Sequence, residues 1–360
     1  MKKFSPLYQD AIDLLCQLIQ TPSFSSAERA TSELIEDFLI TRDVSVERSG
    51  NNIWAFAAPF DRKKPTIWLN SHHDTVKPNS GYTVDPFFPL IENGKLFGLG
   101  SNDAGGCLVS LISTFCFFHE QDLLFNLILI VSAEEEISGK NGISSVIEQL
   151  PPCDLAIVGE PTLMDVAVAE KGLMVIDAKT VGIAGHAARE EGVNAIYLAL
   201  EDLQKVKSFQ FKRKSDFLGD TKVSATVIHG GQQHNVVPDL CEFVLDVRVT
   251  DSYSLEEALN ELGAALNATL TPRSLRLQSS RLEKDHLAWQ AITQLELKTY
   301  GSPTLSDQAL IPFPSLKMGP GDSARSHTAD EFIYLNEIQE GIDGYINFIK
   351  SYSELLKTKI

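Results

Sequence analysis

Basic residues, cysteines and long apolar runs are all scarce in this 360-residue sequence. Lysine and arginine number 31 against 48 aspartates and glutamates, which gives a formal net charge of −17. Nucleic acid and anionic membrane surfaces would repel such a chain, so neither is expected as a partner. The longest apolar segments, near residues 108–118 and 127–131, are too short to span a bilayer.

The five cysteines are odd in number, scattered, and set mostly in apolar runs. This pattern is typical of reduced core residues in a cytoplasmic protein and not of a disulfide framework. We also expect no signal peptide, because residues 2–6 (KKFSP) lead into polar residues and not into an apolar stretch. The sequence contains no internal repeat and no low-complexity tract.

What is present has the composition of an ordinary soluble globular protein, with 43% hydrophobic and 22% charged residues. A chain of this length predicts two domains, or one domain with a large insertion.

Residues 66–76 (TIWLNSHHDTV) contain a short apolar run that ends abruptly in polar residues. The run predicts a buried strand, and ligands of open α/β sheets bind at the carboxyl ends of such strands. His72 and Asp74 point to the same side if the backbone stays extended. A histidine held by a carboxylate is a well-oriented metal ligand, although this short motif alone also fits a solvated turn.

Other candidate ligands follow further predicted elements in the same way. Asp103 lies in a glycine-rich loop before an apolar helix, residues 134–136 (EEE) follow the apolar run 125–131, and Glu160 follows a strand near 154–158. Each acid alone fits a solvated position. Acids at the ends of several buried elements nevertheless predict a metal site at one edge of an α/β sheet.

The pattern changes between residues 172 and 278, where strands and helices follow the order β-α-β-β-α-β of a ferredoxin-like domain. We expect its last strand near 274–277 and a capping box of Ser254 with Glu257 at its second helix. Residues 1–171 and 279–360 form the other domain, in which Ser25 and Glu28 predict another capping box.

The motifs SHHDTV, GLGSNDAGG, EEEISGKNG, GEPT and SHTADE, in this order, resemble one known family over essentially the whole chain. It is the family of co-catalytic zinc amidohydrolases that includes acetylornithine deacetylase, succinyl-diaminopimelate desuccinylase, aminoacylase and glutamate carboxypeptidase. The resemblance implies a zinc-exopeptidase-like catalytic domain, with a mixed sheet between helices. It also implies that the inserted ferredoxin-like domain is a lid through which the protein forms a homodimer.

The resemblance also implies a ligand set for two Zn²⁺ ions, with Co²⁺ as an alternative ion. His72 and Glu160 would bind one ion, Glu136 and His327 the other, and Asp103 would bridge both. Imidazole and carboxylate ligands suit Zn²⁺ chemically. Asp74 would orient His72, and Glu135 would be the general base that takes a proton from the attacking water.

Three residues of the insertion resemble the family's substrate-binding residues. His186, after a glycine-rich turn, would reach the partner subunit's active site and donate a hydrogen bond to the oxyanion. Asn235 and Arg248 would bind the substrate carboxylate, since the planar guanidinium of arginine binds carboxylates with two hydrogen bonds. A loop histidine and a surface cation at a strand end are the plain alternatives for His186 and Arg248.

The activity implied is hydrolysis of the amide bond of an N-acyl amino acid, with N-acetylornithine in arginine synthesis as the first choice. N-succinyl amino acids, N-acetylcitrulline and dipeptides are the alternatives within the family. A catalytically silent binding protein of this family would be expected to have lost a metal ligand or the general base, and this sequence retains all of them. The sequence departs from the family at Glu134, Gly105 and Ala187, where aspartate, lysine and serine are usual.

Overall fold

The computed structural model describes residues 6–119, 121–189 and 191–357. The chain divides into two compact units. The first consists of Met1–Val168, Arg281–Tyr300 and Ser306–Ile360, and the second of Ala169–Ser280 and Gly301–Leu305. The second unit is thus inserted into the first, and it runs from Ala169 to Ser280 where the sequence predicts 172–278, with 301–305 in addition. The backbone of Gly301 packs against Phe217 and Leu218, and the N–H of Lys171 donates to the carbonyl of Ser302 at 3.2 Å.

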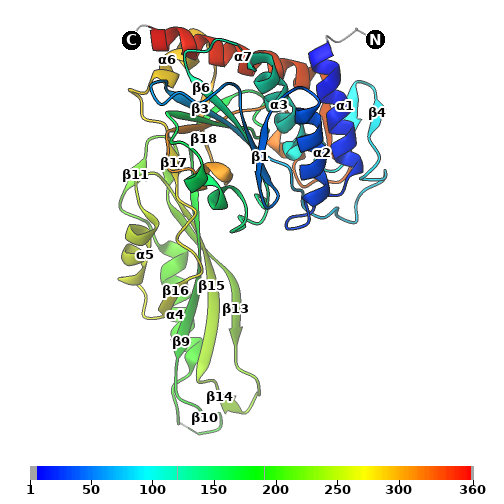
Figure 1. The fold of residues 1–360 in the computed structure, drawn as a ribbon. Coiled ribbons are helices and arrows are strands. Elements are labelled where there is room, and N and C mark those ends of the chain that lie inside the picture. Colours follow the sequence, from blue (N-terminus) through cyan, green and yellow to red (C-terminus); the bar gives the residue numbers. More distant parts are fainter. Residues whose placement is uncertain (1–5, 120, 190, 358–360) are drawn as a thin grey trace. The chain divides into compact units, whose positions relative to one another are not determined.

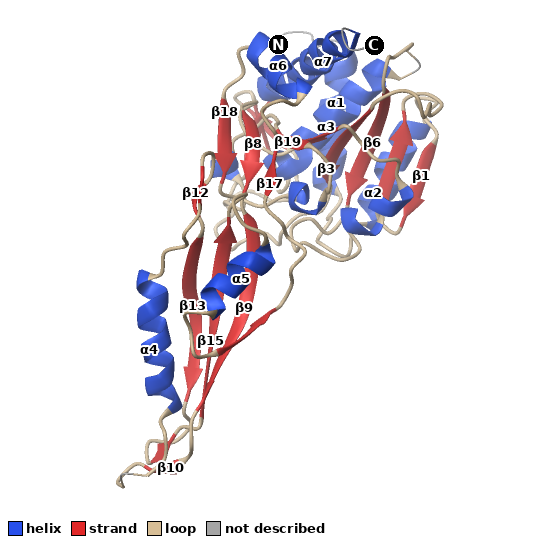
Figure 2. Ribbon diagram, turned by 90° about the vertical axis from the view of Figure 1, so that its left-hand side faces the viewer, coloured by secondary structure: helices blue, strands red, loops and turns tan. Residues whose placement is uncertain are grey.

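A mixed sheet forms the centre of the first unit (Figures 1 and 2). Its strand order is β1-β2-β6-β3-β7-β19-β8-β17, and β18 pairs with β8. β3 is parallel to both β6 and β7, and β19 is parallel to β7, while β1 and β2 are antiparallel to their neighbours and β8 is antiparallel to β19. The strands are β1 (Val46–Ser49), β2 (Asn52–Phe56), β3 (Thr66–His72), β6 (Asn126–Ser132), β7 (Leu155–Val158), β8 (Val166–Glu170), β17 (Ser280–Arg281), β18 (Thr299–Ser302) and β19 (Ser315–Lys317).

Every residue of β3 and β6 is buried, as expected for apolar strands that are covered on both faces. On one face, α1 (Pro6–Gln20), α3 (Gly106–Phe118) and α7 (Leu335–Lys357) pack together, with α3 in contact with both strands. α2 (Arg29–Ile40) contacts β1 and β2, and α6 (Leu287–Gln294) packs on α7. On the other face, Trp54 and Trp68 join a core that is closed by short 3-10 turns at Ile143–Ser145 and Ile147–Gln149.

The predicted capping box of Ser25 and Glu28 is wrong. Glu28 does precede α2, but its side chain is fully buried and makes no cap. Its carboxylate accepts hydrogen bonds from the N–H of Ser26 (2.6 Å), from Asn51 Nδ2 (2.9 Å) and from the N–H of Glu134 (3.3 Å). Contacts with distant segments have therefore replaced the local cap.

The second unit has the predicted ferredoxin-like order (Figure 1). Its sheet runs β13-β15-β9-β16, from β9 (Gly172–Val181), β13 (Lys222–Gly230), β15 (Leu240–Val249) and β16 (Thr269–Pro272). α4 (Ala195–Ser208) and α5 (Leu255–Gly263) share a core with alternate residues of β9 and β15. The capping box of Ser254 and Glu257 at α5 is confirmed. The last strand, however, lies before the predicted residues 274–277.

Smaller sheets complete the described chain. β20 (Phe332–Tyr334), β5 (Lys95–Phe97) and β4 (Leu90–Glu92) form one, β10 (Gly185–His186) pairs with β14 (Val236–Val237), and β11 (Lys214–Ser215) pairs with β12 (Gly219–Asp220). All five cysteines are free. In the part of the chain that the structure describes, no helix is long and apolar enough to cross a membrane.

Candidate metal centre

Strand topology brings the candidate ligands of the first unit to one edge of its sheet. β3 ends at His72, and its parallel neighbours β6 and β7 end just before residues 134–136 and Glu160. The parallel strand β19 leads into the loop that carries His327, and Asp103 lies in the irregular turn Ser101–Gly105 before α3. Because parallel strands end at the same edge, residues far apart in the sequence meet there.

The ligand atoms form two groups that share Asp103. In the first, His72 Nε2 lies 3.4 Å from Asp103 Oδ1 and 3.7 Å from Glu160 Oε1. In the second, His327 Nε2 lies 2.9 Å from Glu136 Oε2 and 3.6 Å from Asp103 Oδ2. Within each group, one ligand atom per residue lies within 4.8 Å of the others. Each oxygen of Asp103 thus faces a different histidine, which is the arrangement of a bridging carboxylate.

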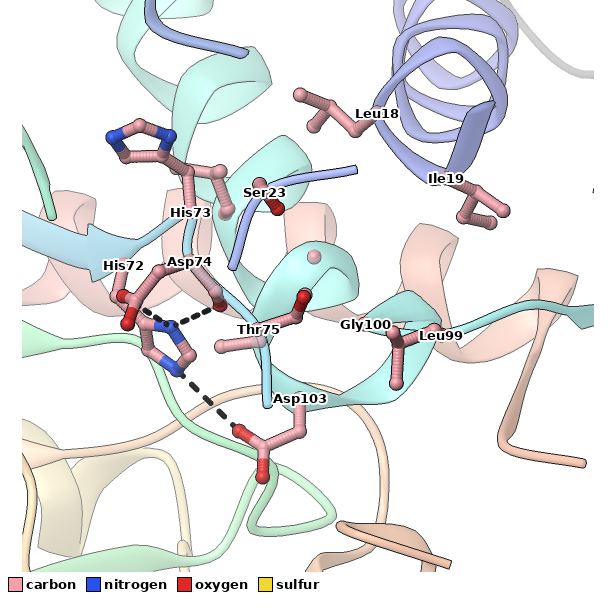
Figure 3. A pocket seen from close by; sticks show the side chains of 13 residues that line it. Leu18, Ile19, Ser23, His72, His73, Asp74, Thr75, Leu99, Gly100 and Asp103 are labelled. Atoms are coloured by element: carbon pink, nitrogen blue, oxygen red, sulfur yellow. Dashed lines mark hydrogen bonds and ion pairs between the residues drawn. The ribbon is translucent and has the colours of Figure 1, made fainter. Parts of the chain in front are cut away.

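Asp74 fixes the ring of His72 (Figure 3). His72 Nδ1 lies 3.0 Å from the Asp74 carbonyl and 3.4 Å from its Oδ1, on the opposite side of the ring from Asp103. The buried Nε2 has no hydrogen-bond partner among the described residues. When Nδ1 donates to Asp74, the lone pair of Nε2 is free for a metal ion. The donor set and this unpaired nitrogen therefore fit a metal site.

Asp74 also orders the loop that follows β6. It is fully buried and accepts hydrogen bonds from the N–H groups of Glu135 (3.0 Å) and Glu136 (3.2 Å) and from Ser25 Oγ (2.7 Å). One carboxylate thus orients His72 and holds the backbone of two neighbouring glutamates. It links the ends of β3 and β6 directly.

The three consecutive glutamates point in three directions. Glu134, in the left-handed region at φ 54°, binds Ser26 Oγ (3.0 Å) and both the N–H and Nδ2 of Asn141 (3.0 Å each). Glu135 places its Oε2 3.9 Å from His72 Nε2, outside both ligand groups. Glu136 contacts His327, as described above. The geometry therefore distinguishes a loop anchor (Glu134), a carboxylate beside the centre but outside both groups (Glu135), and a candidate ligand (Glu136).

The centre carries more negative charge than its own groups can neutralise. Burial raises the pKa of Glu160 to about 8, and the charges of Asp103 and Glu136 add to the shift. Burial, followed by the charges of Glu160 and Asp307, also raises the pKa of Glu135 well above its usual value. Burial alone would lower the pKa of His72, but the neighbouring carboxylates of Asp103 and Asp74 favour its protonated form, outweigh burial and raise the pKa. Bound divalent cations would relieve this repulsion directly.

Sequence reasoning missed several residues that contact the ligands or their loops. Three of them lie within four residues of a candidate ligand in the quoted motifs, namely Asn102, Thr162 and Glu331, so their positions could have drawn attention to them. Ser25 and Asp307 carry no such signal. Asp307 is buried and accepts a hydrogen bond from Ser132, the last residue of β6, and only the fold brings it there.

Gly105, where lysine is usual in the family, has no room for a side chain. A Cβ there would lie 2.3 Å from the carbonyl oxygen of Gly100 and 2.6 Å from Leu15 Cδ1. Real Cβ atoms do not approach other atoms so closely. The turn after Asp103 therefore requires glycine at this position.

His186 and Asn235 lie together at one end of the second unit. β10 and β14 pair His186 with Val236, and the N–H of Ala187 donates to the Asn235 carbonyl at 3.0 Å. The His186 side chain is exposed, and its Nδ1 accepts a hydrogen bond from the N–H of Ala188 at 3.1 Å. An accepting Nδ1 is unprotonated, so the ring proton of neutral His186 lies on Nε2, where it is available as a donor.

Within one chain, Arg248 lies far from Asn235. It lies near the far end of β15, which starts at Leu240, so at ~3.4 Å per residue the two are separated by roughly 25 Å. Arg248 forms a two-bond ion pair with Asp246, at 2.9 and 3.1 Å. An Asn235 and an Arg248 that bind the same carboxylate would therefore have to come from two subunits.

Comparison with known proteins agrees with the fold. Residues 168–273 match the family model of the M20 peptidase dimerisation domain. The chain is 28% identical over 357 residues to acetylornithine deacetylase of Proteus mirabilis, with 89% of this chain and 91% of that protein covered. It is also 28% identical over 361 residues to acetylornithine deacetylase of Shigella sonnei, with 89% and 92% covered.

Solved structures share the fold across both units. Aminopeptidase PepT from Bacillus cereus gives a TM-score of 0.77 at 18% identity, with 96% of this chain and 99% of that chain covered. The YXEP protein of Bacillus subtilis, described as a dinuclear metal-binding peptidase from the M20 family, gives 0.73 at 16% identity, with 97% and 98% covered.

The fold, the paired ligand groups and the homologues define a metal-dependent amidohydrolase. The chain contains an M20 peptidase dimerisation domain and is similar to acetylornithine deacetylases over most of its length, so the resemblance and the fold class predicted from its motifs are confirmed.

Proposed function

We propose that this protein is an N-acyl-amino-acid amidohydrolase with two Zn²⁺ ions, and that it converts N-acetylornithine to ornithine and acetate. The observation that carries the proposal is the pair of ligand groups that share Asp103, with the unligated carboxylate of Glu135 beside them. His72, Asp103 and Glu160 would hold one ion. Asp103, Glu136 and His327 would hold the other.

Two divalent ions, when bound, acidify the attacking water and polarise the scissile carbonyl. Glu135 would take the proton of that water and pass it to the leaving amine nitrogen as the tetrahedral intermediate collapses. Its position supports this role, because it reaches His72 without belonging to either ligand group. Asp74 would hold the His72 ring and the Glu135 backbone in fixed positions relative to each other during the reaction.

A homodimer would complete the site. The second unit exposes Tyr197 (66%) and Leu200 on α4, and Val227 and Ile228 on β13, which is an edge strand of its sheet. Unpaired edges and apolar side chains of this kind favour association with another copy. The Nε2 proton of the partner's His186 would then stabilise the oxyanion, and Asn235 and Arg248 from different subunits would bind the substrate carboxylate.

The substrate is proposed from the two homologues, both of which are acetylornithine deacetylases. An assay with N-acetylornithine, N-succinylornithine, N-succinyl-diaminopimelate, N-acetylcitrulline and a dipeptide tests it, with hydrolysis followed as release of the free amine. The highest kcat/KM is expected for N-acetylornithine. A higher value for another member of the panel would overturn the proposed substrate but not the amidohydrolase reaction. A role in arginine synthesis in the cytoplasm stays a prediction.

Metal removal gives the direct test of the centre. The purified protein should bind two divalent ions per chain, chelation should abolish hydrolysis, and His72→Ala and His327→Ala should each lower the metal content measured by elemental analysis. His286→Ala is the matched control, since His286 also lies in the first unit but binds the carbonyl of Asp154 away from the centre. Full activity of metal-free protein would refute the proposal.

A further inference from the structure

Four of the five candidate ligands lie on irregular segments, and only His72 lies on a strand, at the end of β3. Asp74 holds the backbone of Glu136, whereas Asp103, Glu160 and His327 lie on other loops. Loops are the more mobile parts of a fold. A metal centre needs its ligands held to within about 0.5 Å, so other residues must fix these loops.

Asn102 joins the Asp103 loop to the loop that carries His327. It is fully buried, and its Nδ2 donates to the carbonyl of Asp322 at 3.0 Å. Its Oδ1 accepts a hydrogen bond from the N–H of the same residue at 3.1 Å. Both polar atoms of one side chain thus bind the backbone of one residue, five positions before His327.

Thr162 joins the Glu160 loop to the same segment. Its Oγ1 accepts a hydrogen bond from the N–H of Gly319 at 3.0 Å and donates to the carbonyl of Asp165 at 2.7 Å. Its own N–H donates to the Gly319 carbonyl at 3.1 Å. The loops of Glu160 and His327 are therefore bound to each other at Gly319.

Glu331 holds the Asp103 turn from the other side. It is 2% exposed and accepts hydrogen bonds from the N–H groups of Gly100 (3.0 Å), Asn102 (2.8 Å) and Asp103 (2.8 Å). A carboxylate that accepts three backbone N–H groups fixes the direction of that backbone firmly. Since Asp103 belongs to both ligand groups, its orientation affects both ions.

We propose that Asn102, Thr162 and Glu331 are positioning residues that set the geometry of the paired metal centre by clamping the His327 loop to the loops of Asp103 and Glu160. This clamp rests on the proposed function, because it acts on ions that the same ligands would bind. Residues that orient ligands in this way typically change metal affinity by roughly 10- to 100-fold when they are altered.

The two ions depend on the clamp to different degrees. His327 is 56% exposed, has φ 60°, and is held in place by the loop between Gly319 and Glu331. Glu160 has an anchor of its own, because the neighbouring Gly159 donates to the Asn70 carbonyl (2.7 Å) and accepts from Ser71 Oγ (2.8 Å). Loss of Thr162 or Asn102 should thus weaken the ion at His327 first. Loss of Glu331 should weaken both.

The test is a titration of the full-length, chelator-stripped protein with Co²⁺, followed by calorimetry and visible absorbance. The wild type should show two binding events. Thr162→Val keeps the shape of the side chain but lacks the hydroxyl. In this variant the weaker of the two binding events, assigned to the ion at His327, should lose roughly 10- to 100-fold in affinity, while the tighter event is unchanged. Thr162→Ser should restore the weaker event, and Asn102→Ala should repeat the loss.

Asn126→Ala is the matched control. Asn126 is buried and also clamps a loop, with hydrogen bonds to Asp61 and Lys64, but it lies at the opposite end of β6. This variant should bind both ions as the wild type does. The clamp would be overturned if both Co²⁺-binding events kept their affinity in Thr162→Val and Asn102→Ala, or if Asn126→Ala lost as much affinity as these variants. A wild type that binds no second ion would instead overturn the proposed function.

Discussion

Glu135→Gln should lower kcat by roughly 10²- to 10⁴-fold, the usual contribution of a general acid or base, while metal content and KM stay near those of the wild type. The substitution preserves shape and removes only the ability to accept a proton. Glu135 lies outside both ligand groups, with its Oε2 3.9 Å from His72 Nε2, so no ion should depend on it. Steady-state kinetics with elemental analysis of the same preparation measures both quantities.

The neighbouring glutamates serve as controls. Glu136→Gln should weaken the ion at His327, because its Oε2 is a member of that group. Glu134→Gln should mainly cost stability, about 1–3 kcal/mol, because an amide nitrogen would face one of the donors from Ser26 or Asn141. If Glu135→Gln loses metal and Glu136→Gln does not, the roles assigned to these two residues are exchanged.

The location of the centre was predictable from the sequence because buried strands appear as short apolar runs that end in polar residues. Apolar runs that end in His72, in residues 134–136 and near Glu160 mark the carboxyl ends of β3, β6 and β7, and the structure places these ends side by side. The separate directions of the three glutamates were not predictable from a pattern. They depend on the positive φ of Glu134 and on its contacts with Ser26 and Asn141, which come from distant segments.

Local rules failed where buried polar groups had better partners elsewhere. Ser25 and Glu28 have the spacing of a capping box, yet Ser25 binds Asp74 and Glu28 binds Asn51. Ser254 and Glu257 have the same spacing at an exposed helix start, and there the predicted cap forms. A buried carboxylate requires hydrogen bonds more strongly than a helix end requires a cap, so burial decides between the two outcomes.

Asn235 and Arg248 are close in the sequence but far apart in the fold of one chain. They are separated by one turn and most of β15, and an extended strand carries Arg248 to the other end of the second unit. His186, which is much further from Asn235 in the sequence, is instead its neighbour through the pairing of β10 with β14. If all three residues act on one substrate, the site must draw on two subunits.

An exchange experiment should reveal this sharing. His186→Ala and Glu135→Ala should each be nearly inactive alone, the first because the oxyanion loses its donor and the second because the base is lost. Neither residue belongs to a ligand group, so both variants should bind metal normally. When the two variants are mixed in equal amounts and exchange subunits, about half of the dimers contain one copy of each.

Each mixed dimer would hold one site in which Glu135 of one chain meets His186 of the other. Activity should therefore recover to about a quarter of the wild-type value, since one site in two is complete in half of the dimers. Exchange is verified independently with differently tagged chains and co-purification. If His186 acts within its own chain, no mixed dimer contains a complete site, so verified exchange without recovery would refute its role in the partner's site.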